Sequence, residues 1–242
     1  MVKHTPKVNP ELPKDFTKFL GQFNKPSTVN FSPKAIKAEE GDIVINSPEG
    51  VELCNDRAKL LQTLEREGIP TPPSIHILKD VMNNMSFDDF CDTYEGGEMV
   101  SVEKEKMSTH QGRKELLEFM SRPRDRETLM YGRSLPEYKA EEVTFVPRLH
   151  NMPLLRLESG PMDAVQNGFI NPPSTKDLRP GTRKELIEVL RHIADKLALE
   201  IIKAEIIYSG KDVVVENVSV PFNPRTAAAV RWILTNMAIK GK

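Results

Sequence analysis

Residues 201–221 read IIKAEIIYSGKDVVVENVSVP, and the rest of the chain is interpreted outward from this stretch. Two apolar runs flank Gly210-Lys211, and glycine at the first position of a two-residue loop is typical of a type II′ hairpin turn. Pairing across that turn predicts that Glu205 lies opposite Glu216, with Cβ atoms about 5 Å apart. Facing carboxylates destabilise a sheet unless a cation lies between them, and either Lys203 or a divalent metal ion fits that place. The alternative is a solvated sheet face carrying two ordinary glutamates.

The remaining pattern mixes strands and helices without a regular alternation. This order predicts α+β subdomains rather than a doubly wound parallel sheet. We expect three parts, namely a basic arm and reduced N-terminal segment over 1–45, a first subdomain over 46–134 and a second over 135–242. Strands are predicted at 43–45, 74–78 and 99–106, and a hairpin from 142–149 and 154–158. A helix is predicted to start at Ser47-Pro48, another to run from Ser86 until Gly96-Gly97 ends it, and further helices to span 55–67, 114–120, 182–199 and 226–239. Loops are predicted at 107–113, 121–136 and 159–181.

The first forty residues differ from the rest in composition, with five prolines and seven lysines against four acidic residues. Phe16, Phe19, Leu20 and Phe23 follow helical spacing, which predicts one short amphipathic helix that packs on the body of the protein. A protein partner bound through residues 1–40 is the alternative interpretation.

Composition excludes several functional classes. The 34 basic and 35 acidic residues give a net charge of -1, so no global positive field favours nucleic acid. The arginine-rich stretch 122–133 leaves nucleic-acid binding as a weaker alternative. Two cysteines and five scattered histidines do not suggest a disulfide scaffold or a zinc site. Because apolar runs are short and the first residues do not resemble a signal peptide, we expect no membrane span and a cytoplasmic protein.

A second candidate site follows the strand predicted at 99–106. Lys104 and Lys106 are two residues apart and are predicted to share one strand face. Hydroxyls and main-chain N–H groups from Ser108 to Gly112 follow, and a helix is predicted next. Lysine charge, loop amides and a helix N-terminus together favour binding of a phosphate group. The alternative is that these lysines belong to a solvated surface.

Taken in order, these motifs resemble the ATP-grasp ligases, over about residues 43–226. The opening combines Asn46 before Pro48, the pair Asp56-Arg57, and Gly68-Ile69-Pro70-Thr71-Pro72. The lysine strand and Glu137-Tyr138 follow. The tail from Glu216 to Pro221 is similar to that of glutathione synthetase, and the whole is similar to carboxylate–amine ligases of that and the ribosomal-protein glutamate ligase type.

The resemblance implies an ATP-grasp-like fold of two α+β subdomains and an ADP-forming reaction. ATP phosphorylates a carboxylate to an acylphosphate, and an amine or other nucleophile attacks it, with Mg²⁺ offsetting phosphate charge. The implied substrates are small-molecule or peptide carboxylates and amines. The implied metal ligands are Glu205, Glu216 and Asn217. The implied ATP contacts are Arg57, Lys104, Lys106, Ser108, Gly112, Glu137, Tyr138 and Glu142. The implied catalytic residues are Arg156, which would steady the acylphosphate, and Arg225, which would hold a substrate carboxylate.

Some positions depart from the family pattern. Arg57 stands where the family usually has lysine, Gly112 is the one glycine of the phosphate loop, and Glu205 replaces an aspartate. Glu216 and Asn217 are adjacent, whereas the family separates them by one residue; if Asn217 keeps the family role, the acidic position is Val215. A catalytically degenerate nucleotide-binding or interaction protein of the same fold is therefore the alternative function.

Overall fold

The computed structural model describes most of the chain, and it divides into two compact units. Unit 1 comprises residues 1–55, 141–205 and 218–242, and unit 2 comprises 56–140 and 206–217. The three-part division from the sequence stays a prediction. The described residues are 7–8, 12–23, 26–72, 74–78, 81–82, 98–103, 106–111, 114–115, 118–119, 128–133, 141–150, 155–156, 164–165, 167–171, 180–209 and 212–240.

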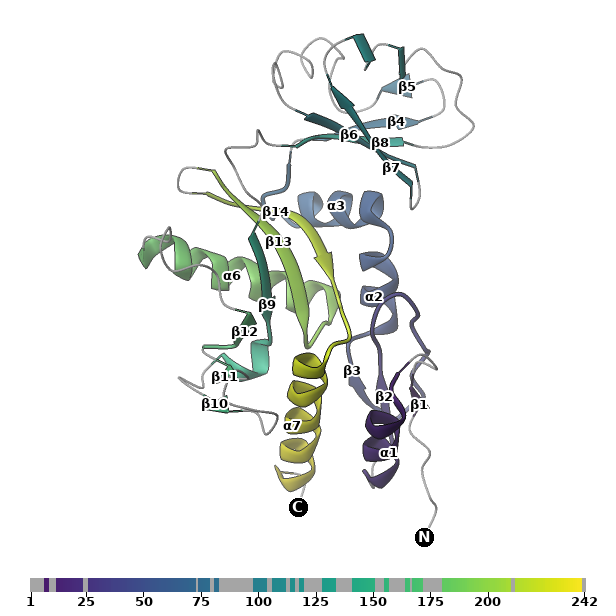
Figure 1. Cartoon of the computed structure of the whole chain (residues 1–242), viewed down its shortest axis with the longest axis vertical. Helices are drawn as coiled ribbons and strands as arrows, with labels where there is room; N and C mark the ends of the chain where they lie inside the picture. Colours follow the sequence, from purple (N-terminus) through teal and green to yellow (C-terminus); the bar gives the residue numbers. More distant parts are fainter. Residues whose placement is uncertain are drawn as a thin grey trace. The chain divides into compact units, whose positions relative to one another are not determined.

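Unit 1 begins with a small parallel sheet, ordered β1 (Lys7–Val8), β2 (Ser27–Val29), β3 (Ile43–Ile45) (Figure 1). Helix α1 (Lys14–Gln22) buries Phe16 and Leu20, and the Phe16 ring meets that of Phe222 at 5.4 Å between centroids. The sequence prediction of a short packed helix is therefore confirmed. Residues 27–29 of the same segment form a buried strand that the sequence did not predict.

Helix α2 (Pro48–Cys54) starts as predicted, with the Ser47 hydroxyl accepting from Gly50 N–H and Pro48 in the first turn. A side chain at Gly50 would overlap the main-chain oxygen of Leu197, so glycine allows α2 to approach α6 (Pro180–Leu197) closely. Helix α6 begins two residues before the predicted Thr182.

The second sheet has the order β12 (Phe169–Asn171), β9 (Glu141–Phe145), β13 (Ile202–Ser209), β14 (Asp212–Ser219). The late hairpin strands are therefore confirmed as neighbours, whereas the opposition of Glu205 and Glu216 stays a prediction. A 3₁₀ turn, η1 (Pro147–Leu149), follows β9, and α7 (Pro224–Lys240) ends the described chain.

The predicted hairpin between 142–149 and 154–158 is wrong. Strand β9 pairs with β12, and β10 (Leu155–Arg156) pairs with β11 (Ala164–Val165). The stretch 159–181, predicted as a loop, thus contains two short strands. Local alternation predicted the strands but not which partners they take.

Asn46 joins the two sheets of unit 1. Its φ of 60° places it in the left-handed region, and its side chain is buried. Its amide oxygen accepts from the N–H groups of Glu200 at 2.9 Å and Ile201 at 3.0 Å, and its amide nitrogen donates to the main-chain oxygen of Asn30. Asparagine tolerates this backbone conformation and satisfies buried groups that would otherwise be costly.

Unit 2 contains α3 (Arg57–Arg66), capped by Asp56, and an antiparallel sheet. The strands have the order β5 (Val81–Met82), β4 (Ser74–Leu78), β8 (Thr128–Arg133), β6 (Glu98–Glu103), β7 (Lys106–Gln111). The N–H of Val215 donates to the oxygen of Pro70, so β14 is bonded to the segment that follows α3.

Two loop predictions in unit 2 are wrong. Residues 106–111 form strand β7, in which Lys106 pairs with Glu103; Lys104 lies outside the described residues, so its predicted shared face with Lys106 stays a prediction. Thr128–Arg133, predicted as part of an irregular stretch, pairs with both β4 and β6. The helix predicted at 86–96 also lies outside the described residues.

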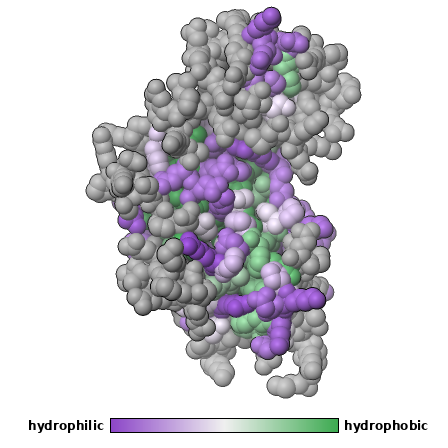
Figure 2. Space-filling view, in the orientation of Figure 1, coloured by the Kyte–Doolittle hydropathy of each residue, from purple (hydrophilic) through white to green (hydrophobic). Residues whose placement is uncertain are grey.

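On the face seen in Figure 2, hydrophilic and hydrophobic residues are mixed among those that are coloured. No helix in the part of the chain that was described is long and apolar enough to cross a bilayer.

Candidate functional site

The structure brings together two residues that the sequence assigned to different roles, Arg57 and Glu216. Arg57 opens α3 and Glu216 lies on β14, both in unit 2. Arg57 Nη2 lies 3.2 Å from Glu216 Oε1 and donates at the same distance to the main-chain oxygen of Glu216. The side chains are 13% and 1% exposed, so the carboxylate is shielded from water and compensated by the guanidinium.

The predicted metal ligands are oxygen donors on neighbouring strands. Glu205 lies half-buried on β13, while Asn217 is half-buried and Glu216 buried on β14. Carboxylate and amide oxygens suit Mg²⁺, so the donor chemistry fits this ion. Within the described ranges, no cluster of three or more His, Cys, Asp or Glu residues could hold a metal ion. The convergence of Glu205, Glu216 and Asn217 therefore stays a prediction.

A second ion pair joins Glu142 on β9 to Lys203 on β13, at 2.7 Å between Oε1 and Nζ. The sequence offered Lys203 as a counter-charge for the two hairpin glutamates. The structure places its amino group on Glu142 instead, because β9 and not a second hairpin strand flanks this side of β13. Lys203 and Glu142 pair across the two central strands of this sheet, and both side chains remain partly exposed.

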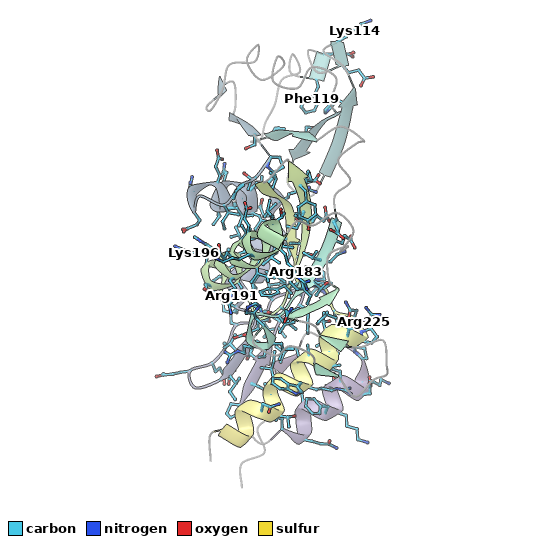
Figure 3. All side chains as sticks on the ribbon, turned by 90° about the vertical axis from the view of Figure 1, so that its left-hand side faces the viewer. Lys114, Phe119, Arg183, Arg191, Lys196 and Arg225 are labelled. Carbon is cyan, nitrogen blue, oxygen red and sulfur yellow. The ribbon has the colours of Figure 1, made fainter. Side chains whose placement is uncertain are left out.

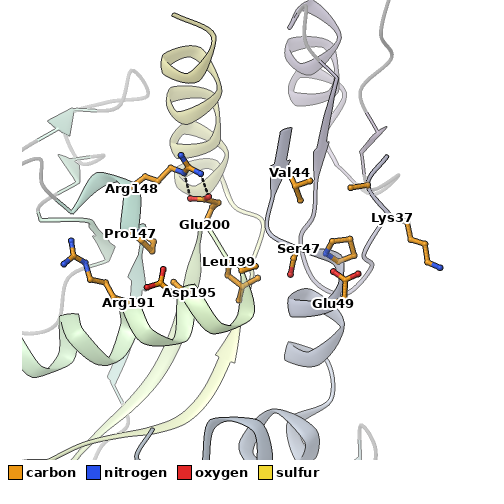
Figure 4. Close-up of a pocket in the computed structure, with 14 residues that line it drawn as sticks. Lys37, Val44, Ser47, Glu49, Pro147, Arg148, Arg191, Asp195, Leu199 and Glu200 are labelled. Atoms are coloured by element: carbon orange, nitrogen blue, oxygen red, sulfur yellow. Dashed lines mark hydrogen bonds and ion pairs between the residues drawn. The ribbon is translucent and has the colours of Figure 1, made fainter. Parts of the chain in front are cut away.

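Unit 1 also contains a pocket that the sequence did not predict (Figure 4). Its volume is about 1000 Å³, and it lies among the start of α2, the end of α6 and η1. Arg148 forms one wall with Glu200, through two hydrogen bonds of 2.6 Å. These bonds raise the pKa of Arg148 above its usual value, against the opposing effect of burial. Asp195 and Arg191 of α6 lie near the mouth of the pocket.

Among the described residues that line this pocket, none is a site residue predicted from the sequence. Arg225 lies at the start of α7, on the opposite side of the unit from Arg191 and Lys196 in Figure 3. The sequence does not predict the pocket because its lining comes from distant segments. Hydrogen bonds of Asn46 with the main chain at Glu200 and Ile201, and of Ser47 with Leu197 and Ala198, bring these segments together.

Solved structures similar to this chain share one fold. The RimK domain protein ATP-grasp from Sphaerobacter thermophilus aligns with a TM-score of 0.53 at 13% identity, over 96% of this chain and 97% of that one. N5-carboxyaminoimidazole synthetase from Staphylococcus aureus, solved with ADP, aligns with a TM-score of 0.54 at 12% identity, over 93% and 72%.

D-alanine–D-alanine ligase from Bacillus anthracis, solved with ATP, aligns with a TM-score of 0.50 at 17% identity, over 83% and 70%. The chain has the ATP-grasp fold. This confirms the α+β class and the resemblance read from the motifs. No family model and no curated protein matches the sequence.

On this ATP-grasp fold, the predicted phosphate segment is only partly described. Lys106 and Ser108 lie on β7, and Ser108 is exposed. Lys106 is therefore on a strand, as predicted, whereas Ser108 belongs to a strand and not to the predicted loop. Arg156 lies on β10. The remaining predicted contacts lie outside the described residues: Lys104, Gly112, Glu137 and Tyr138.

One contact in the ATP-grasp sheet of unit 2 was not expected. Ser101 on β6 is buried, and its hydroxyl lies 2.8 Å from His110 Nε2 on β7. The His110 ring also packs on Phe119, at 4.2 Å between centroids. These contacts indicate that His110 helps to order β7.

Proposed function

We propose that this protein is an ATP-dependent carboxylate–amine ligase that forms ADP through an acylphosphate. The observation that carries the proposal is the ATP-grasp fold, together with oxygen donors on two neighbouring strands of its late hairpin. Three dissimilar proteins of this fold, two of them solved with ATP or ADP, support nucleotide binding as its shared property. A cytoplasmic location belongs to the same proposal.

The proposed site assigns each step to residues of this chain. A substrate carboxylate oxygen attacks the γ-phosphorus of ATP, and ADP leaves. An amine nitrogen then attacks the acyl carbon, inorganic phosphate leaves, and the amine loses a proton. Arg225 would hold a carboxylate, and Arg156 would steady the acylphosphate.

Nucleotide binding is divided among the other proposed contacts. Glu142 would approach the ribose, and Glu137 and Tyr138 would line the adenine site. Lys104, Lys106, Ser108 and Gly112 would contact phosphates, as would Arg57 after it leaves Glu216. Glu205, Glu216 and Asn217 would hold Mg²⁺, which supplies charge compensation for the phosphates.

Titration calorimetry with MgATP tests nucleotide binding, and release of ADP in the presence of paired amino acids or peptides tests turnover. We expect saturable MgATP binding and ADP formation that depends on both a carboxylate and an amine. Absence of MgATP binding by the folded wild-type protein would contradict the ligase proposal.

A second candidate is a nucleotide-binding or interaction protein without turnover. The ion pairs that engage Glu216 and Glu142 favour it, since both carboxylates already have basic partners. This candidate predicts MgATP binding without ADP formation for any carboxylate and amine tested.

A protein partner bound through residues 1–40 is best tested at the surface of α1. Deleting the segment would remove Phe16, Leu20 and Val29 from the core. Replacing exposed Lys14 and Lys18 by glutamine keeps that core intact. Loss of co-purifying protein from this variant, but not from a Lys184→Gln control on exposed α6 surface, supports the partner surface.

A further inference from the structure

The Arg57–Glu216 contact differs from a surface ion pair in the way the guanidinium is held. One nitrogen, Nη2, reaches both the carboxylate and the main-chain oxygen of the same residue, each at 3.2 Å. The Arg57 side chain extends from the first residue of α3, whose start is fixed by the Asp56 cap. The fold therefore holds the positively charged guanidinium of Arg57 against Glu216.

The shielding of this pair has an energetic consequence. Glu216 is 1% exposed, so water cannot replace the guanidinium if it is removed. A buried carboxylate without a compensating charge is strongly unfavourable. The same carboxylate is the residue that we propose as a metal ligand. A guanidinium and a divalent cation that approach Oε1 repel each other in these low-dielectric surroundings.

We propose that Arg57 is a positioning residue that occupies the charge position of the divalent cation while nucleotide is absent. It holds Glu216 in place and opposes metal binding until a cation displaces it from Oε1. The released guanidinium then becomes available to phosphate oxygens, for which it has bidentate geometry. This inference rests on the proposed function, because that proposal assigns Glu216 to the metal.

The test measures Mn²⁺ binding to the full chain without nucleotide. The electron spin resonance signal of free Mn²⁺ reports how much of the ion is bound. Five proteins are compared: wild type, Arg57→Gln, Arg57→Lys, the double variant Arg57→Gln/Glu216→Gln, and the control Lys59→Gln. Lys59 lies on the same helix, and its side chain is 72% exposed and pairs with Asp56.

We expect Arg57→Gln to bind Mn²⁺ at least about tenfold more tightly than wild type, since a competing charge is gone. Arg57→Lys is expected to lie between the two, and Lys59→Gln to match wild type. The double variant should lose the gain, because the carboxylate that binds the ion is absent. Thermal unfolding supplies a second measurement, in which Mn²⁺ should raise the Tm of Arg57→Gln more than that of wild type.

Equal Mn²⁺ affinity in wild type and Arg57→Gln would overturn the inference, and so would a gain that survives in the double variant. If Arg57→Gln does not fold, unchanged affinity in Arg57→Lys overturns it as well. MgATP calorimetry on the wild type separates the two proposals. If the wild type binds MgATP but Arg57→Gln has unchanged Mn²⁺ affinity, only this inference is refuted. If the Mn²⁺ affinity rises in Arg57→Gln and not in the double variant, but the wild type does not bind MgATP, only the ligase proposal is refuted.

Discussion

Two arginine–glutamate pairs in this protein differ in geometry and in exposure. Arg148 and Glu200 form two hydrogen bonds of 2.6 Å, with side chains 47% and 19% exposed. Arg57 and Glu216 approach only to 3.2 Å, with side chains 13% and 1% exposed. Water can replace either partner in the first pair but not in the second. We therefore expect the longer pair to matter more when one partner is removed.

The largest effect is expected from Arg57→Gln, which removes the guanidinium that lies 3.2 Å from buried Glu216. We predict a loss of about 3–5 kcal/mol in the free energy of unfolding. Urea denaturation followed by circular dichroism measures it, with Lys59→Gln as the exposed control on the same helix. A loss similar to that of the control would show that burial does not dominate this pair.

Removing both charges sharpens the comparison. The double variant Arg57→Met/Glu216→Leu keeps similar volume and leaves no buried charge. We predict a stability within about 1–2 kcal/mol of wild type, hence clearly above Arg57→Gln. The same denaturation experiment measures it. If the double variant is as unstable as the single one, the hydrogen bond to the Glu216 main-chain oxygen carries the stability instead.

The sequence predicted the elements near these pairs better than it predicted their partners. The Ser47–Pro48 helix start, the strand at 43–45 and both hairpin strands are confirmed, because caps, proline and alternation act locally. Strand β9 illustrates the limit. Its alternating pattern indicates a strand, but its pairing with β12 instead of residues 154–158 depends on distant packing.

In the candidate site, too, the sequence predicted single residues better than the contacts between them. Arg57 and Glu216 were both selected by motif, yet their contact joins residues 159 positions apart, which spacing cannot predict. Lys203 was paired with the wrong glutamate for the same reason. The Arg148–Glu200 wall of the pocket has no local motif at all, and it depends on Asn46 holding the main chain at Glu200.

A smaller effect is expected from Arg148→Ala. Its two short hydrogen bonds lie at a half-exposed position, so water and ions replace most of their contribution. We predict a loss of about 1 kcal/mol or less at low salt, falling further at about 1 M NaCl. Urea denaturation at both salt concentrations measures it. A salt-independent loss of more than about 2 kcal/mol in the free energy of unfolding would contradict this prediction. It would indicate that hydrogen-bond geometry, and not exposure, decides how much each Arg–Glu pair stabilises the fold.

The smallest effect is expected from Asp15→Asn. Asp15 Oδ2 lies 3.4 Å from Arg231 Nη2, and the Asp15 side chain is 77% exposed. Arg231 does not depend on this partner, because its guanidinium also lies over the rings of Phe16 at 5.7 Å and Phe19 at 5.3 Å. We predict a loss below about 0.5 kcal/mol.

Arg231→Ala should cost more than Asp15→Asn, because it also removes the ring contacts, each contributing about 0.5–1 kcal/mol at an exposed site. Denaturation of both variants side by side measures the difference. Equal losses would mean that the aromatic contacts of Arg231 contribute nothing. If Asp15→Asn lowers the free energy of unfolding as much as Arg148→Ala does, exposure alone does not order the ion pairs of this protein. The Arg148–Glu200 pair is shorter and less exposed than Asp15–Arg231, and neither property would then have added stability.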